Sequence, residues 1–164
     1  MMEKSKKLIL ALKKRKKSVA LAESCSGGYA SYLLTKTPGA SEVFKGAVVV
    51  YSLETKNKFF KIPSSLLKKT QGVSKEVAIK LAIGVRKKFN SDIGASIVGF
   101  ASPEHSRRTG PKTKKGIKVG TTFIAFSSKN KQKAKKIIIK GSRDIIRKKI
   151  SARLIDLIYK AVTN

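Results

Sequence analysis

The stretch LAESCSGGYAS, residues 21–31, joins an apolar run to a segment with a helix-like pattern through two adjacent glycines. Two hydroxyl groups and a thiol, from Ser24, Cys25 and Ser26, stand on the turn between them. In an α/β sheet, ligands lie beyond the carboxyl ends of the strands, at the N-termini of the helices that follow. The stretch therefore predicts a strand–turn–helix unit with a reactive or ligand-binding group on its turn.

The two glycines, Gly27 and Gly28, allow a sharp bend and let the backbone approach a bound atom closely. Free N–H groups at the start of the next helix attract an oxyanion or a phosphate. The Ser24 hydroxyl could attack a carbonyl while the backbone holds the developing negative charge, with Ser26 and the glycines forming the cradle. Glu23 is expected to cap the turn or to orient a base. Serine before glycine is also a common helix N-cap, so a purely structural turn is the alternative.

A second polar turn, YSLETK at residues 51–56, follows the next strand-like run and enters a helical pattern. If the two strands are neighbours, both turns meet at one edge of the sheet, and Lys56 comes close to Ser24. A lysine can take the serine proton only when it is neutral. We expect burial and nearby positive charge to lower the Lys56 pKa, and Tyr51 to relay the proton or orient Ser24. The alternative is that Lys56 is one of many surface lysines.

The rest of the chain alternates between helical and strand patterns. Strands are predicted at 18–22, 46–52, 95–101, 119–128 and 134–141, the last two forming a hairpin. Helices are predicted at 2–17, from the glycine pair to Leu34, at 52–60, from Pro63, after an N-cap at Ser74, and at 143–162. This order predicts an α/β fold, a three-layer α/β/α sandwich with a largely parallel mixed sheet and a C-terminal β-hairpin, as a single domain over residues 1–164.

Composition narrows the class of protein. The 164 residues suit one domain with a proper core. No apolar run approaches the ~20 residues of a membrane span, and the basic N-terminus lacks a small-residue cleavage site. One cysteine and one histidine exclude an internal disulfide and argue against a Cys- or His-based metal site. We expect a cytoplasmic protein that uses no metal and no cofactor and does not enter a membrane.

The net charge is the strongest compositional signal. The chain has 38 Lys and Arg against 9 Asp and Glu, a formal charge of +29. Such a charge predicts salt-sensitive attraction to polyanions. However, lysine occurs in nearly every segment, aromatic residues are not interleaved with it, and known nucleic-acid-binding signatures are missing. A lysine bias spread over the whole surface is therefore favoured, and nucleic acid remains a possible partner.

Residues 102–118 form a long predicted loop rich in Pro, Gly and Lys. A loop of this length in a compact domain is usually functional or disordered. Its six cations are Arg107, Arg108, Lys112, Lys114, Lys115 and Lys118. A cover over an anionic ligand and a solvated segment are equally weighted interpretations.

Four motifs in order carry a family resemblance: AESCSGG (22–28), PGAS..F.GAVVVYS..TK (38–56), GVSKEVA (72–78) and VGTT (119–122). They resemble the C-terminal domain family of the competence/damage-inducible protein CinA, over roughly residues 5–160. Stand-alone members of that family are nicotinamide-nucleotide amidohydrolases, also called NMN deamidases. The resemblance implies hydrolysis of nicotinamide mononucleotide to nicotinate mononucleotide and ammonia, and a homodimer.

The same resemblance implies roles for particular residues. Ser24 takes the position of the nucleophile and Lys56 that of the base, with Tyr51 beside them. The segment GSRDIIR (141–147) resembles the family pattern GDR..VR, which makes Arg143 or Arg147 a ligand of the nucleotide. Gly99 lies in VGFASP, at the place of the family pattern TG.AGP, and joins the predicted substrate-binding set.

The chain also departs from the family pattern near the predicted site. Leu53 stands where the family has asparagine, and Val98 replaces a threonine whose hydroxyl could help to polarise a carbonyl. Ser102 replaces a glycine, and Ser142 replaces an acid. Together with the charge, these departures support the alternative of a catalytically drifted, strongly basic nucleic-acid-binding protein on the same fold.

Overall fold

The computed structural model describes residues 2–102 and 119–163. The predicted loop cover, apart from Ser102, therefore lies outside the described residues. The helices are α1 (Met2–Lys14), α2 (Tyr29–Thr35), the 3-10 helix η1 (Ala40–Glu42), α3 (Leu53–Phe60), α4 (Ser64–Thr70), α5 (Lys75–Lys88) and α7 (Arg143–Thr163). The strands are β1 (Val19–Glu23), β2 (Phe44–Val49), β3 (Ile93–Gly99), β4 (Thr121–Ser127) and β5 (Gln132–Ile138).

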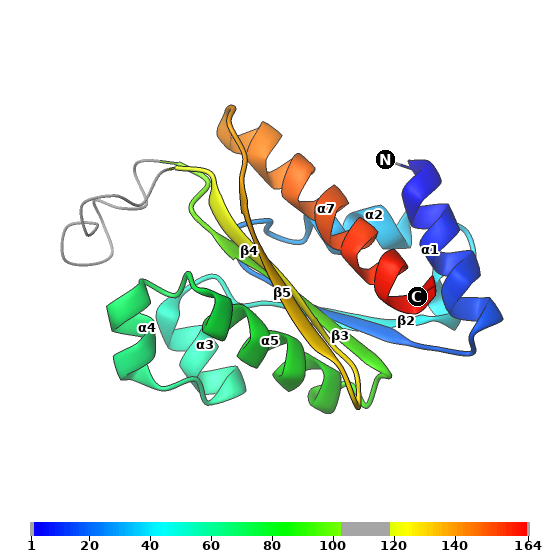
Figure 1. The fold of residues 1–164 in the computed structure, drawn as a ribbon, viewed down its shortest axis with the longest axis horizontal. Coiled ribbons are helices and arrows are strands. Elements are labelled where there is room, and N and C mark those ends of the chain that lie inside the picture. The colour runs from blue at the N-terminus through cyan, green and yellow to red at the C-terminus, as the bar shows by residue number, and fades with distance from the viewer. Residues whose placement is uncertain (1, 103–118, 164) are drawn as a thin grey trace.

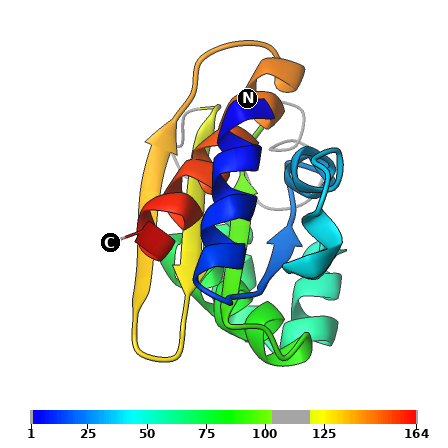
Figure 2. The same ribbon diagram turned by 90° about the vertical axis from the view of Figure 1, so that its right-hand side faces the viewer.

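The strands form one mixed sheet in the order β2-β1-β3-β4-β5 (Figure 2). β1 pairs in parallel with both β2 and β3, and Glu23 lies opposite Val49 at the carboxyl end. β3 with β4, and β4 with β5, are antiparallel, so only two of the four strand pairings are parallel. The predicted hairpin is present as β4 and β5. The predicted mixed sheet is confirmed: it is parallel across β2-β1-β3 and antiparallel across β3-β4-β5.

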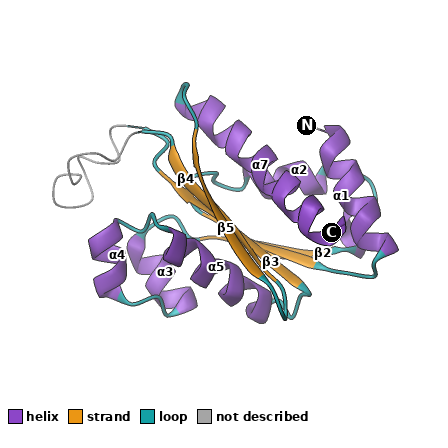
Figure 3. Cartoon of the chain, viewed as in Figure 1, coloured by secondary structure: helices purple, strands orange, loops and turns teal. Residues whose placement is uncertain are grey.

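Helices cover both faces of the sheet (Figures 1 and 3). One core cluster packs between the sheet and α1, α2 and α7, and includes Leu8, Leu21, Ile97 and Ile150. The other packs between the sheet and the α3–α5 side, and includes Ala22, Val50, Leu81 and Val98. The central strands are buried along their whole length, which explains their continuous apolar runs. The predicted three-layer α/β/α architecture is confirmed.

Element ends differ from the predictions for local reasons. The first helix stops at Lys14 instead of residue 17, because Lys16 adopts a positive φ of 50° and Lys17 N donates to the Leu12 carbonyl. β2 stops at Val49, because Ser52 already acts as the N-cap of α3 and accepts from Thr55 N. The predicted N-cap at Ser74 is confirmed, since its side chain accepts from Val77 N.

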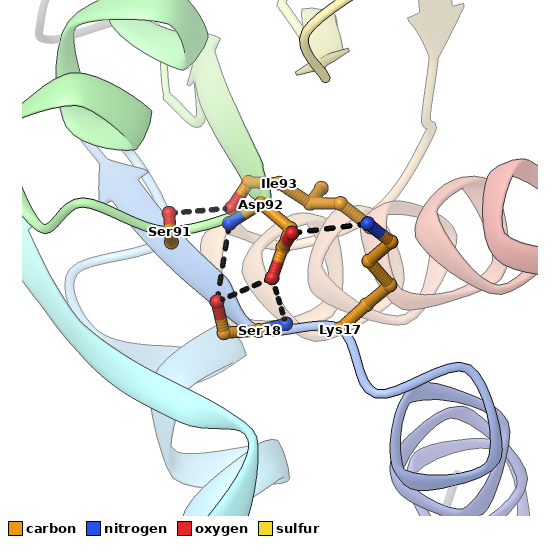
Figure 4. Close-up of polar contacts among 5 residues, drawn as sticks. All are labelled: Lys17, Ser18, Ser91, Asp92 and Ile93. Carbon is orange, nitrogen blue, oxygen red and sulfur yellow. Dashed lines mark hydrogen bonds and ion pairs between the residues drawn. The ribbon is translucent and has the colours of Figure 1, made fainter.

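The amino ends of β1 and β3 are tied together by polar contacts (Figure 4). The Asp92 carboxylate accepts from both Ser18 N and Ser18 Oγ at 2.9 Å, and Ser18 Oγ accepts in turn from Asp92 N. Lys17 Nζ lies 3.1 Å from the same carboxylate. These contacts keep β1 and β3 aligned at the amino edge of the sheet.

Candidate active site

Ser24 and Lys56 meet at the carboxyl edge of the sheet. Ser24 directly follows β1 and is 7% exposed, whereas Lys56 comes from α3, which follows β2, and is 3% exposed. Lys56 Nζ lies 3.1 Å from Ser24 Oγ. Because β1 and β2 are adjacent and parallel, their exits deliver the two side chains to one place. The proximity on which the catalytic hypothesis depends is therefore present.

Three backbone carbonyls surround the Lys56 amine. Nζ donates to the carbonyls of Val50 at 2.9 Å, Tyr51 at 3.1 Å and Ser52 at 3.4 Å. Burial lowers the Lys56 pKa from 10.5 to about 8. Nearby positive charge, also expected to act, is not a cause of this shift. A neutral amine has two N–H donors and one lone pair, so it can donate to two of these three carbonyls at a time and still accept the Ser24 proton.

The Glu23 carboxylate caps the turn after β1. The side chain is fully buried and accepts from Gly28 N, Ala30 N and Ser31 N at 2.8–3.1 Å, and from Ser31 Oγ. The expectation that the first N–H groups of this helix are free was therefore wrong, because Glu23 occupies them. Among the described residues, the Ser26 N–H makes no hydrogen bond and the Cys25 N–H interacts only with its own thiol, so donors remain beside Ser24.

The absence of a side chain at Gly27 allows Arg147 to pack against the turn. Gly27 and Gly28 have φ values of 59° and 92°, which only glycine adopts easily. A Cβ on Gly27 would lie 3.1 Å from Arg147 Nη2. The Arg147 guanidinium donates twice to the Ser26 carbonyl, at 3.2 and 3.1 Å. The structure thus places Arg147 as a support of the turn, a role that its sequence position did not indicate.

Tyr51 and Arg143 lie together at the surface of the site. The Tyr51 side chain is 43% exposed, and its hydroxyl accepts from Arg143 Nη2 at 2.5 Å. Arg143 Nη1 donates to Ser102 Oγ at 2.9 Å. The contact of Tyr51 with Lys56 runs through its backbone carbonyl. Arg143 therefore links the start of α7 to the ends of β2 and β3 and presents a cation at the same edge as Ser24.

The remaining predicted residues lie in packed surroundings. Gly99 ends β3, and a Cβ there would collide with the Thr122 side chain of β4, so packing alone requires glycine. Ser26 is fully buried, and its hydroxyl has no hydrogen-bond partner in the described part of the chain. Val98 is fully buried and Leu53 partly buried, both in the core cluster beside α5. Substrate contacts of Gly99 and Ser26 remain predictions.

Two further residues complete the surroundings of the pair. Gly72, which sequence reasoning did not single out, has a φ of 71°, and a Cβ on it would lie 2.6 Å from Leu53 Cδ2 and 3.5 Å from Lys56 Cε. Its position in TQGVS, just before a helix cap, was the available signal. Burial raises the pKa of the Cys25 thiol to about 12, which makes it a poor nucleophile.

The described residues contain no cluster of three His, Cys, Asp or Glu able to hold a metal ion, and none of their helices could cross a membrane.

The fold and this geometry define an α/β domain with a buried serine–lysine pair at the exits of two adjacent parallel strands. The family model of the CinA C-terminal domain matches residues 2–162, and the chain belongs to that family. A CinA-like protein from Cytophaga hutchinsonii is 38% identical over 81% of this chain and 30% of its own length. Another from Pseudothermotoga lettingae is 34% identical over 96% of this chain and 37% of its own length. The chain thus spans about a third of the curated relatives it matches.

Solved structures of the family share the fold. A CinA superfamily protein from Klebsiella pneumoniae superimposes with a TM-score of 0.89 at 19% identity, covering 99% of this chain and 97% of that chain. A competence or damage-inducible protein from Enterobacter asburiae gives a TM-score of 0.88 at 23% identity, covering 98% and 97%. At such identities the likeness shows the fold and carries no residue roles.

Proposed function

We propose that this domain is an amidohydrolase that converts the carboxamide of nicotinamide mononucleotide to the carboxylate of nicotinate mononucleotide and ammonia. The observation that carries the proposal is the buried contact between Lys56 Nζ and Ser24 Oγ. Family membership is consistent with an enzyme domain of this type. The substrate is taken from the family resemblance, since stand-alone members act on this nucleotide.

In the proposed acylation, neutral Lys56 accepts the Ser24 proton while Oγ attacks the carboxamide carbon. The N–H groups of Cys25 and Ser26 are the donors that would hold the resulting oxyanion. When the intermediate collapses, the carbon–nitrogen bond breaks and Lys56 returns the proton to the leaving nitrogen, which departs as ammonia. Ser24 is left as an ester of the pyridine carboxylate.

Deacylation repeats the sequence with water. Lys56 takes a proton from water, whose oxygen attacks the ester carbon, and the bond to Oγ breaks. The proton then returns from Lys56 to Ser24 Oγ, and the carboxylic acid formed loses its remaining proton to solvent and leaves as the carboxylate. The carbonyls of Val50, Tyr51 and Ser52 keep the amine in place throughout. A buried amine with a pKa of about 8 can act as base and acid near neutral pH.

The substrate also carries a phosphate, which needs a cation at this edge. Arg143 is exposed and has hydrogen bonds only to the hydroxyl groups of Tyr51 and Ser102 among the described residues. Its guanidinium therefore keeps its full charge for a phosphate at the mouth of the site. Arg147, held by the Ser26 carbonyl, acts through the turn instead.

Ammonia release from nicotinamide mononucleotide by the purified protein tests the proposal. Ser24→Ala should lower turnover by at least about 10³-fold, because residues 2–102 and 119–163 contain no other hydroxyl beside a buried amine. Ser41→Ala removes an exposed hydroxyl on η1 and should leave turnover unchanged. Absence of turnover by the wild-type protein would exclude this substrate. Equal turnover by Ser24→Ala and wild type would exclude Ser24 as the nucleophile.

A further inference from the structure

A cavity opens at the amino edge of the sheet, at the end opposite to the candidate active site. Its volume is about 650 Å³, and it lies between the end of α1, the end of α5, the β4–β5 turn and the end of α7. Four cations line it, namely Arg15, Lys17, Arg86 and Lys129, with Asp92 as the acid. The length of the five-residue strand β1, roughly 17 Å, separates this edge from Ser24.

Arg86 is the residue that indicates a ligand. Its Nε atom is buried without a hydrogen-bond partner, and within residues 2–102 and 119–163 its guanidinium makes no hydrogen bond or ion pair. Its position is fixed, because α5 packs closely on β3, where a Cβ on Gly94 would lie 2.6 Å from Arg86 Cβ. The Nε atom is closed to solvent, so a ligand in the cavity would reach the two Nη atoms, which carry the unpaired charge of the guanidinium and can bind the oxygens of an oxyanion.

The acid in this cavity does not offset the charge of Arg86. Asp92 is already held by Lys17 and by Ser18, as Figure 4 shows. The Lys17–Asp92 pair is close to neutral as a unit. Arg15, Arg86 and Lys129 therefore leave the cavity with an excess of positive charge.

Helix ends give an alternative reason for these cations. α1, α5 and α7 all end here, and basic side chains near a helix C-terminus offset its dipole. This explains Arg15, whose Nη2 donates to the Thr163 carbonyl at 3.4 Å. It does not explain Arg86, whose Nε meets no carbonyl.

We infer that this cavity binds a phosphorylated small molecule, with a phosphate at the Nη atoms of Arg86. Lys129 and Arg15 supply further positive charge for a dianionic group. Ile93, Ala161 and Val162 give the cavity an apolar wall against which an organic body can pack. The cavity volume falls in the range of small-molecule sites. This inference is independent of the proposed amide hydrolysis at Ser24.

Titration of the full chain with pyrophosphate tests the inference, by calorimetry and by amide NMR shifts in about 150 mM salt, where distant surface charges are screened. Arg86→Gln should raise the pyrophosphate Kd about tenfold or more, because it removes a charge-assisted, two-oxygen contact. Lys129→Gln, on an exposed turn, should raise it by about threefold. Lys136→Gln, an exposed lysine of β5 outside the cavity, removes the same charge and should leave the Kd nearly unchanged.

The location is read from the amide shifts, which should appear at Asn90 and Asn130. Shifts at Gly27 and Gly28 instead would place the anion at the candidate active site and overturn the inference. An equal increase of the pyrophosphate Kd in all three variants, or no saturable pyrophosphate binding by the wild-type protein, would also overturn the inference. If Arg86→Gln does not fold, the pyrophosphate Kd of Lys129→Gln is compared with that of Lys136→Gln, and equal values would overturn the inference. Amide hydrolysis should be unchanged in all three variants, so either proposal can fail without the other.

Discussion

Lys56 Nζ lies 3.1 Å from Ser24 Oγ, although the two residues are 32 positions apart in the chain. β1 and β2 are adjacent and parallel, and each is followed at once by a polar turn. The parallel pairing of β1 and β2 therefore brings Ser24 and Lys56 together, and the carbonyls of Val50, Tyr51 and Ser52 hold the Lys56 amine in place.

The buried lysine should make stability depend on pH. The Lys56 pKa is about 8 in the folded chain and 10.5 when exposed, so between these values the unfolded state binds more protons. The free energy of unfolding should therefore rise with pH from about 8 to 10.5, by up to about 3 kcal/mol from this group. Below pH 8 the lysine is charged in both states and contributes no slope.

Denaturant unfolding at several pH values measures this effect. Lys56→Met should lose this part of the slope, whereas Lys58→Met, an exposed lysine on the same helix, should keep it. Identical slopes in Lys56→Met and Lys58→Met would show that Lys56 is not held with a lowered pKa.

Glu23 should position the nucleophile through the turn. Glu23→Ala leaves several buried donors without an acceptor and should lower the free energy of unfolding by about 3–5 kcal/mol. Glu23→Gln keeps one acceptor and should fold, with a lower kcat for amide hydrolysis and little change in KM. Glu54→Ala, an exposed acid at the start of α3, is the matched control and should change neither. Unchanged kcat in a folded Glu23→Gln protein would show that the cap serves stability alone.

Ser26 offers a test that separates binding from folding. Its buried hydroxyl has no partner among the described residues, so Ser26→Ala should leave stability unchanged or raise it by up to about 1 kcal/mol. If the hydroxyl contacts substrate, as the sequence predicts, kcat/KM should fall by about tenfold. Thermal unfolding and steady-state kinetics on the same sample measure both. A variant with wild-type kinetics would remove Ser26 from the substrate-binding set.

Gly72 should be needed to seat the lysine stem. Gly72→Ala forces a side chain into a backbone with φ 71° and against Leu53, beside Lys56. We expect a loss of about 1–3 kcal/mol in stability together with a lower kcat. Gly39→Ala imposes similar backbone strain at φ 81°, where the nearest atom is the flexible end of Lys13, and should leave kcat unchanged. Equal kinetics in the two variants would show that Gly72 is a turn residue without influence on Lys56.

The sequence allowed the principal contact to be predicted because its signals were local. An apolar run followed by polar residues marks the end of a strand, and this held for both the buried strand β1 and the edge strand β2. Ser74 was identified as a cap from its position before a helical stripe, and the contact with Val77 N confirms it. The direction of the β3–β4 pairing has no local signal of this kind, since it depends on how β4 enters the sheet.

Other features depend on side chains that meet only in the folded chain. Nothing in LAESCSGG shows whether Glu23 or a ligand occupies the N–H groups of α2. Arg147 resembled a nucleotide ligand from its motif, but it supports the Ser26 carbonyl from 121 residues away. The family pattern places Val98 near the predicted site, yet its side chain packs in the core beside α5. Contacts between residues far apart in the chain leave no periodic pattern in the sequence, so they cannot be predicted from it.

The pH dependence of amide hydrolysis tests the central claim most directly, that a neutral Lys56 activates Ser24. kcat/KM for nicotinamide mononucleotide should increase about tenfold per pH unit below the inflection. It should level off above pH about 8, the pKa that burial gives Lys56. Lys56→Met should lower kcat/KM by about 10²–10⁴-fold, with Lys58→Met near wild type. A profile flat from about pH 6 to 9, or wild-type turnover by Lys56→Met, would contradict the account.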